Sequence, residues 1–203
     1  MSVTTLLAIS LGAILTNNFI FAQFLGICPF LGVSKKLDSA VGMSLAVTFV
    51  MVVATAATWP IQMLLLTPAS GAWDLGYLQT IVFILIIAIL VQLLENFLKK
   101  FVPALYKALG VYLPLITTNC TILGVTILNI DNGYNFIESI VCAAGAGIGF
   151  LVAMVLFSGV RRRVEQAVTP ACFKGLPITL VAAAMTSLSF MGFGGIVEAI
   201  FRV

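Results

Sequence analysis

The sequence contains no histidine, and only 8% of its 203 residues are charged. Histidine is the commonest general base and the commonest ligand of catalytic zinc, so its absence argues against both chemistries. About a quarter of the residues in a soluble domain are charged, and a share this low argues against that class. The basic residues are scattered rather than gathered in one patch, so we expect no nucleic-acid partner. None of the four cysteines forms a C-x-x-C pair, which argues against a disulfide framework or a self-contained zinc site.

Apolar residues are abundant instead, at 62% of the chain, with a mean hydropathy of +1.20. A membrane helix needs roughly 20 such residues. Six runs qualify, and polar residues with Gly or Pro interrupt the first and the fourth. The runs cover residues 3–33, 40–66, 77–98, 104–130, 136–160 and 176–201. We therefore predict an all-α integral membrane protein with six transmembrane helices, of which helices 1 and 4 are interrupted.

The basic residues predict the orientation of these spans. Three connections, which six spans place on one side, hold nine of the ten Lys and Arg residues. They are Lys35, Lys36, Lys99, Lys100, Lys107, Arg161, Arg162, Arg163 and Lys174. Cytoplasmic loops carry the excess of Lys and Arg, so we expect both termini on the non-cytoplasmic side.

One motif occurs twice. The segment from Cys28 to Val33 (Cys-Pro-Phe-Leu-Gly-Val) is echoed by Cys-Thr-Ile-Leu-Gly-Val from Cys120. Three spans fall in residues 1–98 and three in 99–203, and this odd number inserts the second half upside down. Inverted repeats place functional sites at the repeat interface near the bilayer midplane. We therefore predict two inverted three-helix repeats, 1–98 and 99–203, that bring Cys28 and Cys120 together in the membrane.

Cys142 and Cys172 fit the ordinary role of cysteine as a small packing residue, and the sequence assigns them no function. Cys28 and Cys120 stand at helix breaks, where non-helical backbone is tolerated only against protein or a cavity. A disulfide between them is one alternative. Zinc would normally require histidine as well. A [2Fe–2S] cluster requires four cysteines, so a second chain with a similar motif would supply the other two.

Polar residues and glycines surround the two cysteines. Either they satisfy backbone groups freed by the breaks, or they orient the loops and donate hydrogen bonds to cluster sulfurs. The candidates for this supporting role are Asn17, Asn18, Gly26, Pro29, Thr118 and Asn119. For Gly26, Gly32 and Gly124 we expect unusual backbone dihedrals or close approach of another segment.

The cysteine motifs and their flanks closely resemble one family, the A subunits of the Rnf complex. The matching stretches are Asn17–Phe19, Phe24–Lys36, Leu113–Cys120, Leu123–Val125, Val91-Gln92 with Glu95, Ala104–Tyr106 with Leu109-Gly110, and Phe190–Phe193. The resemblance therefore spans essentially the whole chain. The E subunit of the sodium-pumping NADH:quinone oxidoreductase is a sister family, but the Asn17-Asn18 pair and Cys28-Pro29-Phe30 favour the Rnf version.

This resemblance implies a membrane subunit of an ion-translocating ferredoxin:NAD oxidoreductase, in the bacterial cytoplasmic (inner) membrane and not catalytic alone. Its partners would be an inverted homologous membrane subunit of the Rnf E type, the B, C, D and G subunits, and the lipid bilayer. Cys28 and Cys120 map to this chain's two ligands of a [2Fe–2S] cluster shared with the E-type subunit. Electron transfer would be coupled to Na⁺ or H⁺ transport.

Two other functions remain open from the sequence. Many secondary transporters are also inverted repeats with broken helices, and there the polar residues would bind substrate. A purely structural anchor for other redox subunits is the third. Replacing Cys28 or Cys120 by Ser separates these hypotheses, because only a cluster site loses iron and electron transfer together.

Overall fold

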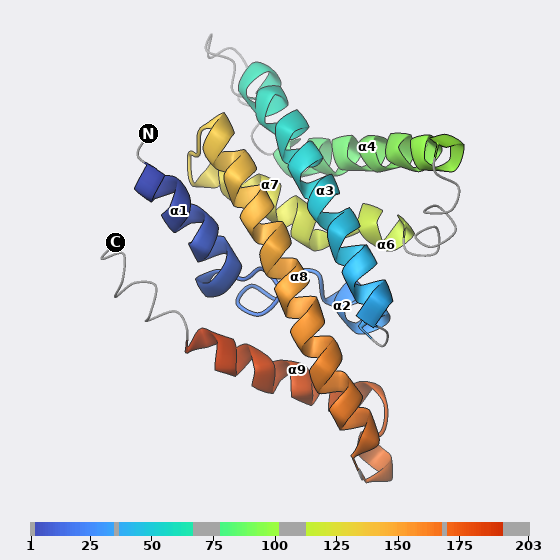
Figure 1. The fold of residues 1–203 in the computed structure, drawn as a ribbon. Coiled ribbons are helices and arrows are strands. Elements are labelled where there is room, and N and C mark those ends of the chain that lie inside the picture. Colours follow the sequence, from blue (N-terminus) through green and yellow to red (C-terminus); the bar gives the residue numbers. More distant parts are fainter. Residues whose placement is uncertain (1–2, 35–36, 67–77, 102–112, 168–169, 193–203) are drawn as a thin grey trace.

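The computed structural model describes residues 3–34, 37–66, 78–101, 113–167 and 170–192. Within these ranges the chain is helical and contains no strand, so the predicted all-α class is confirmed. The elements are α1 (Val3–Leu11), η1 (Gly12–Thr16), α2 (Ile27–Val33), α3 (Leu37–Ile61), η2 (Gln62–Leu66), α4 (Gln79–Phe101), α6 (Leu113–Thr117), α7 (Cys120–Asp131), α8 (Phe136–Gln166), η4 (Ala171–Phe173) and α9 (Leu176–Met191) (Figure 1).

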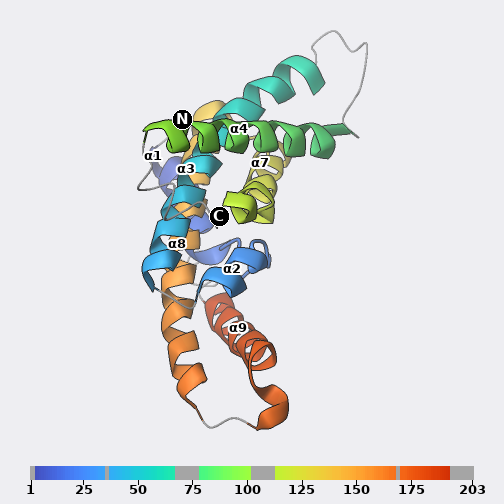
Figure 2. The same cartoon turned by 90° about the vertical axis from the view of Figure 1, so that its right-hand side faces the viewer.

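Helices α3 and α8 form the centre of the fold and run side by side in opposite directions (Figures 1 and 2). Met51 on α3 and Met154 on α8 are fully buried in the core that this pair contributes to. The backbones approach closely at Gly147, where a methyl group would lie 2.4 Å from the Thr48 side chain. Small residues on helix faces permit such approach, which is how apolar helices gain contact area in a membrane.

The shorter elements pack around this pair. Helix α1 and η1 contact α8, while α7 contacts α3 and α8. Helix α4 lies across α3, and α9, which follows the C-terminal end of α8 in the chain, packs against α8 (Figure 1). Short helix α2 contacts both α3 and α6. The broken segments of the two halves are therefore neighbours, although α2 and α6 are far apart in the sequence.

Both expected interruptions are present. Residues 17–26 separate η1 from α2, and residues 118–119 separate α6 from α7. Two helices are long and apolar enough to cross a membrane, namely Leu37–Leu64 and Phe136–Gln166. Four shorter apolar helices accompany them: Thr5–Thr16, Gln79–Leu93, Leu115–Asp131 and Leu176–Met191. Parts of the predicted fourth and sixth runs, 104–112 and 193–201, lie outside the described residues.

One expectation about the basic residues is wrong. The sequence predicts a connection at Arg161, Arg162 and Arg163, but α8 continues to Gln166 and includes all three. Arg161 is only 8% exposed, whereas Arg162 and Arg163 are exposed. The charge rule reports which side of a membrane a segment faces. It does not say whether the charges stand in a loop or in the last turns of a helix.

Candidate functional site: the junction of the two helix breaks

The first break is organised by the buried side chain of Asn18, which is 1% exposed. Its amide nitrogen donates to the carbonyl oxygens of Ile14 (3.1 Å) and Gly149 (2.9 Å). Its amide oxygen accepts from the backbone N–H groups of Ile20 (3.1 Å) and Phe21 (3.4 Å). These four bonds use the full capacity of the carboxamide. They favour the role of satisfying freed backbone groups, and they tie the loop to α8.

The adjacent Asn17 behaves differently. Its side chain is exposed, and its backbone N–H closes the end of η1 by donating to the Gly12 carbonyl oxygen at 2.7 Å. Two neighbouring asparagines therefore have unequal roles, one buried in the loop's hydrogen bonds and one on its surface.

Gly26 ends the first break and begins α2 in a left-handed conformation, with φ of 84°. Its backbone N–H donates to the Cys120 sulfur at 2.9 Å, across 94 positions of sequence. A methyl group at Gly26 would lie 2.2 Å from the Thr121 hydroxyl oxygen and 3.3 Å from the Asn119 amide oxygen. Only glycine combines this dihedral with this approach, so the expectation for Gly26 is confirmed.

The second break is closed by Asn119, which is 4% exposed and caps the N-terminus of α7. Its amide oxygen accepts from the Thr121 backbone N–H at 3.1 Å. Gly124, one turn further along α7, lies so close to Leu25 that a methyl group there would be 2.4 Å from a Leu25 methyl. The first break therefore rests against the first turns of α7 at two points, Gly26 and Leu25.

The cysteines occupy distinct places relative to this junction. Cys120 is the first residue of α7 and is half-buried, with its sulfur against the start of α2. Cys28 is the second residue of α2 and is exposed. Cys142 is buried in α8, Cys172 is exposed near α9, and all four thiols are free. The disulfide alternative for Cys28 and Cys120 is thus not adopted in this structure.

The remaining candidates stand at the edges of the junction. Pro29 is buried in the first turn of α2, where its missing N–H costs nothing because the first-turn N–H groups lack helical partners anyway. Thr118 is exposed between α6 and α7. Gly32, also in α2, has no atom within 4 Å of an added methyl group and no left-handed dihedral. The expectation of close approach is wrong for Gly32, which lies on an exposed face.

The donor set of the junction fits half of a [2Fe–2S] site. Cys120 already accepts a backbone N–H, and hydrogen bonds of this kind to a cluster sulfur tune the potential of a cluster. Such a cluster needs four thiolates. Across the described ranges, no group of three or more His, Cys, Asp or Glu side chains could hold a metal. At this junction Cys28 and Cys120 would supply two of those four sulfurs.

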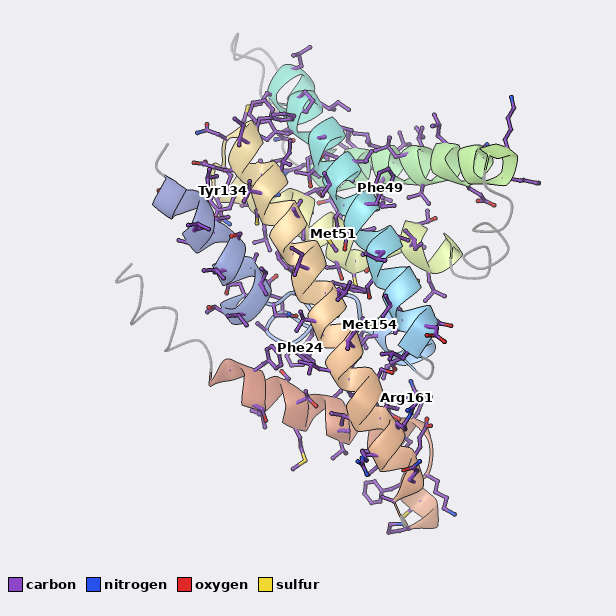
Figure 3. All side chains as sticks on the ribbon, viewed as in Figure 1. Phe24, Phe49, Met51, Tyr134, Met154 and Arg161 are labelled. Atoms are coloured by element: carbon purple, nitrogen blue, oxygen red, sulfur yellow. The ribbon has the colours of Figure 1, made fainter. Side chains whose placement is uncertain are left out.

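The loop before α2 contains one residue with a strained backbone, Phe24. Phe24 has a φ of 56°, which is unusual for a residue other than glycine, and its side chain is 57% exposed. Figure 3 labels it on the loop before α2, close to the ribbons of α8 and α9. Strained backbone persists where the surrounding structure requires it and is typical of functional sites.

Sequence reasoning missed two supports of the site. Phe30 of α2 stacks on Phe157 of α8 with ring centroids 4.0 Å apart, and Phe21 of the loop packs edge-on against Phe30 at 5.8 Å. The other support is Arg161, one helical turn after Phe157, which contacts the end of α2 (Figure 3). Position 161 follows Phe157 by four residues and therefore shares its buried face. That spacing was the signal for Arg161.

Comparison with known proteins identifies the family of the chain. A family model described as "Rnf-Nqr subunit, membrane protein" matches residues 6–197. The chain is 56% identical to the A subunit of the Na(+)-translocating ferredoxin:NAD(+) oxidoreductase complex of Acetobacterium woodii, over 94% of this chain and 97% of that protein. It is 55% identical to the A subunit of the ion-translocating oxidoreductase complex of Syntrophotalea carbinolica, over 95% and 97%. The corresponding protein of Serratia proteamaculans is 50% identical, over 96% and 99%. The chain belongs to the Rnf-Nqr family of membrane subunits.

Proposed function

We propose that this chain is the A subunit of an ion-translocating ferredoxin:NAD oxidoreductase complex of the Rnf type. Near-complete coverage of relatives with that name supports the proposal. In the complex the chain is a membrane component that serves electron transfer and ion translocation and has no catalytic activity alone.

The observation that carries the chemical part is the hydrogen bond from the Gly26 N–H to the Cys120 sulfur, two residues ahead of Cys28. We propose that Cys28 and Cys120 hold this chain's share of a [2Fe–2S] cluster, which would supply a one-electron carrier inside the membrane. The N–H of Gly26 orients the Cys120 sulfur. Asn119 fixes the start of α7, and Asn18 fixes the loop that leads to α2.

The other two sulfur ligands belong, in this proposal, to a homologous membrane subunit of the Rnf E type inserted in the opposite orientation. Exposed Cys28 and exposed Phe24 supply a surface for it at the end of one loop. The B, C, D and G subunits would complete the path between ferredoxin and NAD. The location is the bacterial cytoplasmic membrane, with both termini on the non-cytoplasmic side and Na⁺ or H⁺ as the coupled ion.

The proposed architecture is six spans in two inverted repeats, 1–98 and 99–203. Several contacts support equivalence of the halves. A broken segment carrying a cysteine precedes each of the long antiparallel helices α3 and α8. The next helix packs on the long helix in both halves, as α4 on α3 and α9 on α8. Helix α4 also contacts α6, and α9 contacts η1, so the final helix of each half meets the broken segment of the other half.

The test is single replacement of Cys28, Cys120 and Cys172 by Ser in the intact complex. Cys172 is the matched control because it is also exposed and free but lies far along the chain, in η4. Iron, acid-labile sulfide, the electron paramagnetic resonance (EPR) signal of the reduced complex and ferredoxin:NAD turnover are measured. We expect Cys28→Ser and Cys120→Ser to lose about two iron atoms and turnover, and Cys172→Ser to keep both.

The competing functions give different results. A secondary transporter, or a structural anchor for other subunits, tolerates serine at Cys28 and Cys120 with unchanged iron. Unchanged iron and unchanged turnover in both variants would overturn the proposed cluster.

A further inference from the structure

We infer that Arg161 is a positioning residue that fixes helix α2, and with it Cys28, against α8. This inference rests on the proposed function only for the consequence at the cluster. We call the hydrogen bonds from Arg161 to Leu31 and Ser34 the clamp, and its effect on α2 can be measured without a cluster.

Arg161 makes three hydrogen bonds from a nearly inaccessible position. Its Nη1 donates to the Leu31 carbonyl oxygen at 2.5 Å and to the Ser34 hydroxyl oxygen at 2.7 Å. Its Nε donates to a Glu165 carboxylate oxygen at 3.1 Å. Two of the three acceptors belong to the last turn and the cap of α2, and the third lies on α8 itself.

The acceptors on α2 need such a donor. The last carbonyl groups of any helix have no partner within it, and Leu31 lies in the last turn. Ser34 caps this end and is completely buried. The two hydrogens of Nη1 serve both acceptors on α2, while Nε of the same rigid plane bonds Glu165, so the guanidinium fixes α2 and α8 in one geometry. The positive charge also suits the C-terminal end of a helix.

Helix α2 depends on contacts of this kind because it has only seven residues. Isolated helices shorter than about 12 residues are marginal in water and are held by packing. Arg161 holds the C-terminal end of α2, and one turn earlier Phe157 stacks on Phe30 in its middle. The N-terminal end of α2 is held by the hydrogen bond from the Gly26 N–H to the Cys120 sulfur. Cys28 therefore sits between one anchor on α7 and two on α8.

The burial of Arg161 makes the clamp sensitive to replacement. Glu165 is half-exposed, at 51% of its side chain, so that salt bridge alone contributes little. Removing the guanidinium leaves Leu31 and Ser34 with buried, unpaired acceptors, which is costly. The nearby Arg162 carries the same charge on the exposed side of α8 and is the matched control.

The experiment compares Arg161→Gln, Arg161→Lys, Ser34→Ala and the control Arg162→Gln in the purified complex. Hydrogen–deuterium exchange of the peptide over residues 27–34 reports opening of α2. We expect exchange about tenfold to hundredfold faster for Arg161→Gln and less for Arg161→Lys and Ser34→Ala. Arg162→Gln should match the parent. Ser34→Ala added to Arg161→Gln should have no further effect on the exchange rate, because either substitution alone removes the hydrogen bond between Arg161 and Ser34.

The second readout is release of cluster iron to a chelator, with the EPR spectrum of the iron that remains. Loss of a residue that orients a metal ligand costs about 10–100-fold in metal affinity, so we expect iron release about tenfold faster for Arg161→Gln and an altered spectrum. If Arg161→Gln does not assemble, Ser34→Ala decides the inference by the same two readouts.

The outcomes separate the two proposals. Unchanged exchange over 27–34 in Arg161→Gln, or in Ser34→Ala when the former does not assemble, overturns the clamp. Faster exchange with unchanged iron release and spectrum overturns the role of the clamp in positioning Cys28. A parent complex with no iron on these cysteines overturns the proposed function, while the exchange measurement still judges Arg161.

Discussion

Replacement of Gly26 by Ala should disrupt the junction more than any other single methyl group in this region. Gly26 adopts φ of 84°, and the left-handed conformation costs another residue about 1–3 kcal/mol. The new methyl carbon would lie 2.2 Å from the Thr121 hydroxyl oxygen and 3.2 Å from the Phe150 ring. Overpacking of a well-filled interior costs about 1–3 kcal/mol more. The two effects together predict that Gly26→Ala lowers the free energy of unfolding by about 2–6 kcal/mol.

The same substitution should displace the Gly26 N–H from the Cys120 sulfur, because the clash pushes α2 away from α7. Two measurements on the purified complex follow this, the apparent midpoint of thermal unfolding and the iron content. About 2–4 °C is lost per kcal/mol in a chain of this size. We therefore expect a midpoint lower by roughly 4–24 °C and reduced iron.

Gly32→Ala is the matched control for this prediction. Gly32 lies on the same short helix, has no left-handed dihedral, and would place its methyl group in open space. Alanine is favoured over glycine within a helix by about 0.5–1 kcal/mol, so the midpoint should rise slightly. Thr121→Ala in the Gly26→Ala background removes the clashing oxygen and should restore part of the loss. Equal midpoints for Gly26→Ala and Gly32→Ala would refute the reasoning.

Three further predictions concern the surroundings of the junction. Asn18→Ala should lower the free energy of unfolding by about 2–4 kcal/mol, since it leaves buried backbone groups unpaired. Asn17→Ala, at the exposed neighbour, should change the free energy of unfolding by less than about 0.5 kcal/mol. Similar effects of the two substitutions would contradict the structure. Asn119→Ala removes the cap of α7 and should lower the free energy of unfolding by about 1 kcal/mol, measured by thermal unfolding of the complex. Asn119→Asp should retain most of that stability. Burial, with smaller contributions from Cys142 and Glu138, raises the pKa of the Tyr134 phenol, in the connection before α8, above its usual 10.0. Its contribution to stability is complete below pH 10 and declines as the pH rises through the raised pKa, so Tyr134→Phe should flatten the fall of the unfolding midpoint above pH 10.

The sequence predicted the breaks because polar residues and glycine are conspicuous inside apolar runs. Gly26 as a point of close approach follows from a local rule, and so does a polar side chain at Asn119 that satisfies a freed backbone N–H. The same rules could not rank neighbours. Asn17 and Asn18 are chemically identical, and only the arrival of α8 at Gly149 decides which of them is buried.

The contacts between segments that are distant in the chain could not be predicted from the sequence. The bond from Gly26 to Cys120 depends on how α2 and α7 pack, and nothing local encodes it. Gly32 has the same residue type and the same repeat position as Gly124, yet Gly124 meets Leu25 and Gly32 meets nothing. The run of three arginines predicts a connection at Arg161, whereas the four-residue spacing from Phe157 places Arg161 on the buried face of α8.

The most direct measurement of the account is an experimental density map of the intact complex at the junction of α2 and α7. We expect metal density bonded to the sulfurs of both Cys28 and Cys120, with two cysteines of a second membrane protein closing its other side. Sulfurs that lie far apart, or that face lipid with no metal between the two proteins, would contradict the account.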